Sequence, residues 1–450
     1  MKNSMSVRKH ISYFERACLF FQHSGLSSSP GSYFIHNKNL GEVRLGTGVG
    51  RRAELSSQTG DGENLASMLE EERVRFEALK ADLGEEVPCF FLISGDFQRG
   101  VRDEGLPLAI FVQPRIEFCF SDELAHGETS YAKDPDAERY ACQLLSAFMC
   151  NVVEPCSVVQ PTLVPPFSDI SEEWERLETD ETFLQRLENG IQALQDHPQG
   201  KMTMMRSFQK RVAKSLDRFD LFRLHARNNG EYACSHFFCL EEGIYSLGCS
   251  PENAFEIIAD ELRVDVVAAT CKSGQGEAFE KRELFQNPKQ VKEHMVTAET
   301  RKSRYASFCV GGIMQHTKRL QIKRLRNVCH LYSLLIGALQ PNITMFDIIQ
   351  GLFPIMGARP KELLPVSDSE RSPHHFYGGI VGHWGAGYTG CFLNLRNALI
   401  QDDMLHAKVG MGVLRESNAR NELVETEDKV SGLMEAVFLW HRGNGARFDN

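Results

Sequence analysis

The sequence lacks the patterns that mark membrane and secreted proteins. Its 450 residues contain no run of 18 or more apolar residues, which argues against a transmembrane helix. The apolar stretch near the N-terminus is interrupted by Glu15, Arg16 and His23, and no small-residue cleavage site follows, so we expect no secretory signal. The basic start leaves a plastid-type transit peptide as an alternative. The 13 cysteines show neither a C-x-x-C pair nor zinc-ligand spacing, which predicts reduced thiols in a cytoplasmic protein.

An excess of basic residues is also missing. There are 60 acidic and 50 basic residues, and the net charge of −10 argues against a general nucleic-acid binder. The net charge does not exclude a small anionic substrate, because local lysines and arginines decide its binding. The composition, 42% hydrophobic and 24% charged, is typical of a globular protein. Residues 127–170 are rich in loop signals and carry prolines at positions 155, 161, 165 and 166, which predicts a boundary or an excursion there. We expect an N-terminal region, 1–170, and a C-terminal region, 171–450, within one compact structural unit.

Apolar runs separated by short turns predict the strands. Two runs, 87–97 and 106–120, are rich in aromatic and branched residues and predict a buried antiparallel pair. Further strands are predicted at 201–208, 231–240, 244–250, 253–260, 261–269, 375–385, 389–400 and 404–413. The short turns between neighbouring runs favour antiparallel hairpins over parallel crossovers. The pattern predicts an α+β fold with large antiparallel β-sheets flanked by helices.

Amphipathic stretches predict the helices. They cover residues 10–22 and 65–83, two segments after Asp169, and the region 276–306. Ser171 and Thr182 are the expected N-caps of the two helices after Asp169.

One stretch, Met411 to Lys429, combines a glycine-rich strand with an acidic helix. Glu422, Glu425 and Lys429 project from one face of that helix, and Thr426 lies beside Glu425. Two carboxylates one turn apart suit Mg²⁺, which prefers oxygen ligands. The same spacing is typical of a solvated, salt-bridged helix, so the stretch alone leaves both interpretations open.

Eight short motifs extend this stretch into a family resemblance. They are GCSPE (248–252), VAAT (267–270), PKQVKEH (288–294), CHL (329–331), FYGGIVG (376–382), LR (395–396), GMGV (410–413) and NELVETEDK (421–429). From about residue 185 to 440 the chain resembles the chorismate-utilising enzymes: anthranilate synthase large subunit, aminodeoxychorismate synthase, isochorismate synthase and salicylate synthase. The resemblance implies a sandwich of antiparallel sheets, with the catalytic region at 171–450 and a variable half, 1–170, that completes the sheets.

The resemblance also implies a site for a substrate with two carboxylates. Glu293 and Glu425 would bind Mg²⁺, with Glu422 contacting a metal-bound water or the metal itself. The expected substrate contacts are Thr270, Lys289, His330, Tyr377, Gly378, Gly379, Arg396, Gly410, Gly412 and Lys429. The glycines would let backbone N–H groups approach the ligand, although a sheet bend or bulge explains each of them equally well.

Lys201 decides which reaction the resemblance favours. The isochorismate and salicylate synthases carry a lysine at this position, and the nitrogen-using enzymes a glutamine. We therefore expect Lys201 to act as the general base that activates water for attack at ring carbon 2, and Glu252 as the general acid for the carbon-4 hydroxyl. An exposed lysine at a strand start is the alternative for Lys201. The segment 295–307 lacks the signature of the nitrogen-using enzymes, so we expect an isochorismate synthase, monomeric and without a glutamine amidotransferase subunit. Salicylate synthase shares the same residues.

Two departures from the family pattern fall near the expected site. Ala269 replaces the glycine that precedes the motif threonine, and the loop 352–364 is about two residues shorter, with Arg359 inserted. A methyl group where a special glycine conformation is needed is destabilising. A catalytically impaired, chorismate-binding homologue is therefore a further alternative.

Overall fold

The computed structural model describes the chain in thirteen segments. They are residues 12–56, 65–83, 87–97, 99, 105–122, 125–129, 135–150, 167–229, 232–324, 328–367, 369, 372–385 and 387–448. The four prolines at 155 to 166 lie outside these residues. Within the described segments of the chain, no helix is long and apolar enough to cross a membrane.

The described residues form 18 strands that join into one continuous, antiparallel sheet system. The strands are β1 (Tyr33–Asn37), β2 (Glu42–Leu55), β3 (Cys89–Ile93), β4 (Ala109–Phe120), β5 (Ala125–Thr129), β6 (Glu175–Arg176), β7 (Lys201–Arg211), β8 (Cys234–Glu241), β9 (Ile244–Ser250), β10 (Asn253–Ile258), β11 (Glu261–Lys272), β12 (Gln315–Arg324), β13 (Val328–Ala338), β14 (Ala358–Arg359), β15 (Ile380–Gly385), β16 (Tyr388–Leu393), β17 (Asn397–Gln401) and β18 (Met404–Val413). The predicted pair of β3 and β4 is confirmed, as are the β8–β9 and β10–β11 hairpins.

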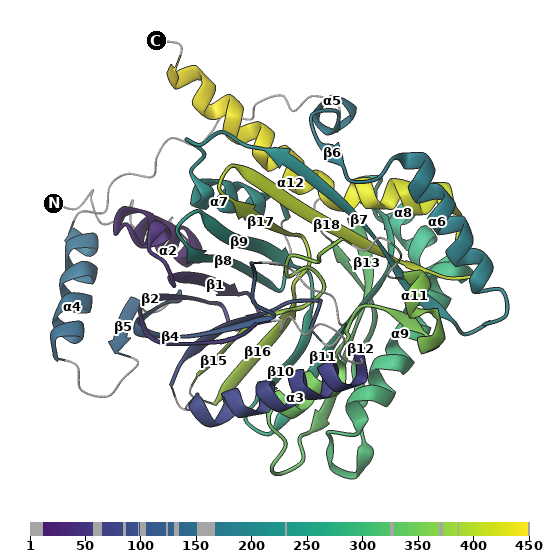
Figure 1. Ribbon diagram of the computed structural model, residues 1–450, viewed down its shortest axis with the longest axis horizontal. Helices are drawn as coiled ribbons and strands as arrows, with labels where there is room; N and C mark the ends of the chain where they lie inside the picture. Colours follow the sequence, from purple (N-terminus) through teal and green to yellow (C-terminus); the bar gives the residue numbers. More distant parts are fainter. Residues whose placement is uncertain are drawn as a thin grey trace.

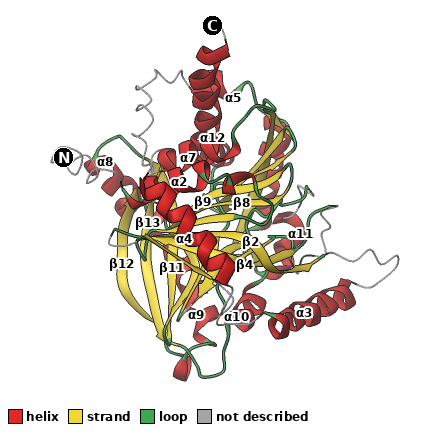
Figure 2. Cartoon of the chain, turned by 90° about the vertical axis from the view of Figure 1, so that its left-hand side faces the viewer, coloured by secondary structure: helices red, strands yellow, loops and turns green. Residues whose placement is uncertain are grey.

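Helices cover the outside of the sheets (Figures 1 and 2). They are α2 (Tyr13–His23), α3 (Leu65–Asp82), α4 (Pro135–Cys150), α5 (Phe167–Ser171), α6 (Asp180–Ala193), α7 (Arg218–Asn229), α8 (Glu277–Lys281), α9 (Pro288–Ala306), α10 (Met345–Leu352), α11 (Leu364–Ser367) and α12 (Ala419–Phe448). The longest helix, α12, packs on α7 and β18, and α9 packs on β11. The helical spacing predicted for Glu422 to Lys429 is therefore confirmed.

Most of the strand pairing follows one path through two halves of the sandwich, with β5 added beside β4 and β14 beside β7. The first half is β6–β7–β18–β17–β9–β8–β1–β2, and the second is β4–β3–β15–β16–β10–β11–β13–β12. The long β2–β4 pair joins the two halves. Strands of the N-terminal region thus lie inside the same sheets as later strands, since β1 pairs with β8 and β3 with β15.

Alternating side chains bury both faces of the central strands. In β3, Phe90 and Leu92 point into a core shared with Tyr33 of β1, where Phe90 stacks on Tyr33 with ring centroids 4.9 Å apart. The neighbouring Phe91 points to the opposite face and joins a second core under α3 and α10. A strand buried on both faces is apolar throughout, which explains why the sequence shows continuous apolar runs here.

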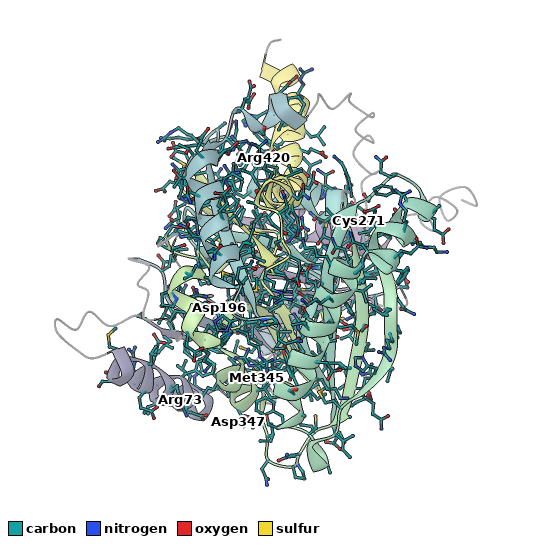
Figure 3. All side chains as sticks on the ribbon, turned by 90° about the vertical axis from the view of Figure 1, so that its right-hand side faces the viewer. Arg73, Asp196, Cys271, Met345, Asp347 and Arg420 are labelled. Atoms are coloured by element: carbon teal, nitrogen blue, oxygen red, sulfur yellow. The ribbon has the colours of Figure 1, made fainter. Side chains whose placement is uncertain are left out.

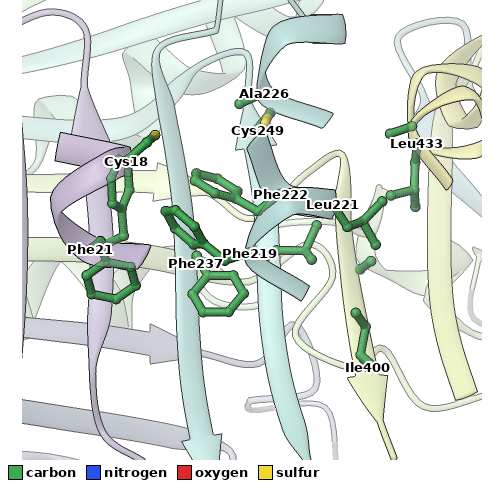
Figure 4. Close-up of a cluster of buried hydrophobic side chains, with 14 of the residues drawn as sticks. Cys18, Phe21, Phe219, Leu221, Phe222, Ala226, Phe237, Cys249, Ile400 and Leu433 are labelled. Atoms are coloured by element: carbon green, nitrogen blue, oxygen red, sulfur yellow. The ribbon is translucent and has the colours of Figure 1, made fainter. Parts of the chain in front are cut away.

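A third core lies between the first half of the sandwich and its helices. Phe21 of α2, Phe219 and Phe222 of α7 and Phe237 of β8 form a group of edge-on and tilted rings (Figure 4). The protein therefore has helices outside and two sheet halves inside. The predicted α+β sandwich flanked by helices is confirmed.

Several predictions about helices were wrong. The region expected to be loop-rich contains β5 and α4, and α7 was not predicted. Ser171 ends the short helix α5 and does not begin a helix. Thr179, not Thr182, caps α6: its Oγ1 accepts a hydrogen bond from the Thr182 N–H at 3.2 Å.

Two long elements expected from the sequence are interrupted. The helix expected at 276–306 is broken by a π-turn at 282–286, and α9 begins anew behind the cap Asn287. The run 389–400 forms two strands, because Arg396 has a left-handed backbone with φ of +50°.

A bulge in β11 places the unusual Ala269 in a strained conformation. The register against β13 shifts between Ala268 and Thr270, and Ala269 has φ of +66°. The left-handed conformation costs an L-residue roughly 1–2 kcal/mol. The backbone has therefore kept the glycine-type conformation although the sequence carries alanine.

We predict that Ala269→Gly costs less stability than Ala268→Gly, by about 1–2 kcal/mol. Both changes remove a buried methyl group and add freedom to the unfolded chain, but only the first relieves a left-handed alanine. Urea unfolding of the two variants measures the difference. Equal losses of unfolding free energy would show that Ala269 is unstrained.

Candidate active site

A cavity of about 650 Å³ opens where the ends of the two sheet halves face each other. It is lined by β7 and β18 from one half, by β11 and β13 from the other, and by α9, α12 and the 351–364 segment. The predicted site residues in its lining are Lys201, Glu252, Thr270, Glu293, His330, Tyr377, Arg396, Gly410, Gly412, Glu425 and Lys429. Lys289, Gly378, Gly379 and Glu422 are not among the lining residues.

Each acidic side chain predicted to bind a metal is paired with a lysine. Glu293 Oε1 accepts a hydrogen bond from Lys201 Nζ at 3.2 Å, and Lys201 Nζ also donates to Thr297 Oγ1 at 2.9 Å. On α12, Lys429 Nζ lies 2.6 Å from Glu425 Oε1. Among the described residues, no three acidic, histidine or cysteine side chains stand close enough together to hold a metal ion as they are arranged here.

The third pair, Lys289 and Glu422, lies at the centre of this acidic group. Lys289 Nζ is 2.7 Å from Glu422 Oε1. Burial opposes the charge of Lys289, but Glu422, Glu293 and Glu425 together raise its pKa above the ordinary value. Burial, helped by Glu425, raises the pKa of Glu422. For Glu425, burial would raise the pKa, but Lys429, Lys289 and His330 together lower it. The three carboxylates therefore create a field that favours a cation between them.

The bulge at Ala269 and the histidine opposite it form one wall of the cavity. Thr270 is anchored by Gln290, whose Oε1 accepts from the Thr270 N–H at 3.0 Å and whose Nε2 donates to the Thr270 carbonyl at 3.0 Å. His330 Nδ1 lies 3.2 Å from Thr270 Oγ1 and 3.3 Å from the Ala269 carbonyl. Cys271, labelled in Figure 3, follows Thr270 in β11.

His330 is a neutral side chain with one free acceptor. Burial, with Arg396 and Lys429 nearby, lowers the pKa of His330 to about 3. Because the Ala269 carbonyl can only accept, Nδ1 carries the proton and Nε2 is left as an acceptor. Nε2 is buried and has no hydrogen-bond partner among the described residues. A hydroxyl group of a ligand would satisfy it.

Arg396, Tyr377 and Lys429 form the opposite, cationic wall. Arg396 Nη1 donates to the Lys429 carbonyl at 2.5 Å, and burial lowers the pKa of Arg396 to about 10. Lys429 Nζ donates to the Gly410 carbonyl at 2.9 Å, and a Cβ at Gly410 would lie 3.0 Å from the Tyr377 hydroxyl. Two cations and a phenol side by side suit the carboxylates of a dianion.

The other glycines predicted for the site, Gly378, Gly379 and Gly412, differ in why the structure needs a glycine there. A Cβ at Gly379 would lie 1.9 Å from the Ile93 carbonyl of β3, and the Gly378 N–H donates to the Asn394 carbonyl at 3.0 Å. Gly378 has φ of +69°, a backbone conformation that favours glycine, and Gly379 permits the close approach of two backbones. Their contact with a ligand stays a prediction. Gly412 does face the cavity, beside the Lys201–Glu293 pair.

Arg301 is a site residue that sequence reasoning missed. Its Nη1 lies 3.0 Å from Glu252 Oε2, which also accepts from the Val267 N–H at 3.1 Å. Burial raises the pKa of Glu252, Arg301 opposes this, and Asp265 adds to it. Arg301 follows Glu293 by eight residues on α9, a spacing that places both on one helix face and could have suggested its role.

Solved structures share this fold. The chain superposes on MenF, the menaquinone-specific isochorismate synthase from Escherichia coli, with a TM-score of 0.66 and 16% identity over 92% of this chain and 90% of that one. It superposes on anthranilate synthase component I from Streptococcus pneumoniae TIGR4 with a TM-score of 0.66 and 17% identity, covering 87% and 92% of the two chains.

Sequence relatives point to the same group. Anthranilate synthase component 1 of Arthrobacter globiformis is 25% identical over 314 residues, which is 67% of this chain and 58% of that protein. The chain thus matches less than two thirds of the length of this relative. A sequence profile described as chorismate binding enzyme matches residues 31–435. Because that profile covers most of the sequence, the chain belongs to the chorismate-binding enzyme family.

Proposed function

We propose that this protein is an isochorismate synthase, which interconverts chorismate and isochorismate with the help of Mg²⁺. The observation that carries the proposal is that Lys201 and Glu252 line one cavity together with Arg396 and Lys429. A base and an acid thus share the cavity with two cations for the carboxylates of the substrate. Isochorismate synthases are also among the solved structures with this fold.

In the proposed reaction, water adds at ring carbon 2 and the carbon-4 hydroxyl leaves. Lys201 would take the proton of the attacking water, and Glu252 would protonate the departing oxygen, while the ring double bonds shift between the two carbons. The raised pKa of Glu252 supports its role as the acid, because burial favours the neutral carboxyl. Nε2 of neutral His330 would accept a hydrogen bond from a hydroxyl of the substrate.

Glu293 and Glu425, with Glu422 beside them, would hold the Mg²⁺. Their carboxylate oxygens are the ligands that Mg²⁺ prefers, and their combined field already acts on the Lys289 ammonium. When bound, Mg²⁺ would neutralise the ring carboxylate of the substrate as a Lewis acid.

A second candidate is the formation of anthranilate, because the curated relatives are named anthranilate synthase component 1. The name implies a partner subunit for those proteins. Lys201 is the observation against this candidate, since its position carries glutamine in the nitrogen-using enzymes that the sequence resembles. A salicylate synthase would use the same Lys201 and Glu252 and would also release pyruvate.

The first test is product analysis with purified protein, chorismate and Mg²⁺, and a parallel sample with EDTA. We expect isochorismate to approach a fixed ratio with chorismate, and EDTA to abolish the conversion. Lys201→Gln should reduce turnover by roughly 10²–10⁴-fold, the range for loss of a general base. Lys210→Gln is the control, a lysine on the same strand that pairs with Glu173 outside the cavity.

Other products would reject the proposal in distinct ways. Salicylate with equimolar pyruvate would establish the salicylate synthase, and anthranilate formed only with ammonium would establish the nitrogen-using reaction. No product under any of these conditions would indicate the impaired homologue.

Gly412→Ala should disable the site without unfolding the protein. A Cβ there would lie 2.5 Å from Lys201 Cε and 2.8 Å from Glu293 Oε1, and both side-chain ends can move away. Because misplacing a catalytic group by about 1 Å costs roughly 10²-fold in rate, we expect a loss of that size with an almost unchanged melting temperature. Gly385→Ala is the control, with no atom nearer than 3.6 Å to the new Cβ. Full turnover of Gly412→Ala would mean that the position of Lys201 is unimportant.

The pH dependence should reveal Glu252 as the acid. An acid must be protonated, so activity should fall as pH rises through the raised pKa of Glu252. Arg301→Gln removes the cation that lowers this pKa, and the falling limb of kcat against pH should move to higher pH. Asp265→Asn removes an anion that raises it, and the limb should move to lower pH. A limb that stays in place in both variants would assign it to another group.

A further inference from the structure

The cavity lining carries positive charge that the proposed reaction does not use. The cationic side chains in the lining are Lys201, Arg301, Arg304, Arg359, Lys361, Arg396 and Lys429, and the acidic ones are Glu252, Glu293 and Glu425. Each of these acids has its own partner, namely Arg301, Lys201 and Lys429 in turn. Arg304, Arg359 and Lys361 form no ion pair with any acidic side chain that the structure describes.

Of these three cations, Arg304 lies farthest along α9 from the predicted metal ligand Glu293, and Arg359 contacts the same helix between them. Glu293, Thr297, Thr300 and Arg304 follow one another along one face of α9. At a rise of 1.5 Å per residue, Arg304 lies about 16 Å along the helix from Glu293. Arg359 reaches the same stretch of α9, since its Nη1 donates to Thr300 Oγ1 at 2.8 Å.

Placing these side chains together is unfavourable without an anion. Burial lowers the pKa of Arg304, and the charges of Arg301 and Arg359 lower it further. A cluster of like charges on a protein wall attracts an anion and is stabilised by it. Arginine binds planar carboxylate and phosphate groups through two parallel hydrogen bonds, and the guanidinium of Arg304, which lines the cavity, has no hydrogen-bond partner among the described residues.

Arg359 stands in the segment where the sequence departs from the family pattern. It is the inserted residue of the shortened 352–364 loop, and it lies in β14, which pairs with the start of β7. The register places Arg359 opposite Lys201, so the insertion adds a cation directly beside the proposed base.

We infer that Arg304, Arg359 and Lys361 form a second anion-binding subsite, which takes a carboxylate or phosphate group in addition to the two carboxylates of the substrate. The inference rests on the proposed function only for the statement that Arg396 and Lys429 serve the substrate carboxylates. The bound group belongs either to a separate small anion or to an extended substrate.

The test is calorimetric titration of the full-length protein with inorganic phosphate and with malonate, at constant ionic strength. Wild type should bind at least one of the two anions, and Arg304→Gln and Arg359→Gln should each weaken this binding about tenfold or more, the size expected for a charge-assisted hydrogen bond. Arg51→Gln, at an exposed arginine of β2 outside the cavity, should bind like wild type. Thermal unfolding of each variant verifies its fold.

Two results would overturn the inference. Either anion binding is unchanged in Arg304→Gln and Arg359→Gln, or it is lost in Arg396→Gln instead, which would mean that the anion occupies the carboxylate place of the substrate. Competition with chorismate identifies the source of the group. Simultaneous binding supports a separate anion, and competition with an increased KM in Arg304→Gln supports a group on the substrate itself.

The result of the anion titration can be interpreted independently of the proposed reaction. If chorismate yields no isochorismate but the two arginine variants lose anion binding, the subsite stands and the proposed function fails. If isochorismate forms and the variants bind anions like wild type, the reverse holds.

Discussion

The pairing of each cavity carboxylate with one cation is the interaction on which the site depends. A charged carboxylate at the boundary of a sheet core is stable only if a cation or several hydrogen bonds compensate its lost hydration. Glu252 meets Arg301, Glu293 meets Lys201, and Glu425 meets Lys429. The first pair joins α9 to the corner between β9 and β10, and the second joins α9 to β7. The third pair lies within α12. The charges that hold the elements in place are thus the charges available for chemistry.

The shape of the sandwich leaves room for the site at one end of the sheets. In the middle, side chains of strands such as β1 and β3 fill an apolar core on each face, and the buried Glu117 there is compensated by Arg44 and His383. At the outer strands β7, β18, β11 and β13 the two halves separate, and the cavity opens between them. The polar side chains of the site gather there because the core no longer excludes them.

The positive charge of the cavity contrasts with the acidic character of the whole chain. The chain carries a net charge of −10, yet cationic side chains outnumber acidic ones in the cavity lining. A cleft lined by one sign of charge, with walls of low polarisability, focuses the potential on the ligand. The local arrangement of charge, and not the net charge of the chain, therefore sets the potential inside the cavity.

The sequence alone predicted many of the strands and the family, and most of the site residues it proposed line the cavity. Continuous apolar runs predicted β3, β4 and β8 to β11, because strands buried on both faces need apolar side chains throughout. The spacing of Glu422, Glu425 and Lys429 placed them on one face of a helix, since helical geometry is local. Helix α7 was missed although it packs on α12, and the break before α9 was missed although Asn287 and Pro288 form a local helix-start signal.

The ion-pair partners of the site residues follow only from the tertiary structure. The pairs Glu252–Arg301 and Lys201–Glu293 join residues 49 and 92 positions apart, and no local pattern encodes such contacts. The same holds for Gly379, whose need for a missing side chain comes from the Ile93 carbonyl of another strand. It holds also for Arg304 and Arg359, which come together because β14 pairs with β7 beside α9. The local sequence specifies the helices and strands, whereas the long-range packing of sheets and helices specifies which charged side chains meet.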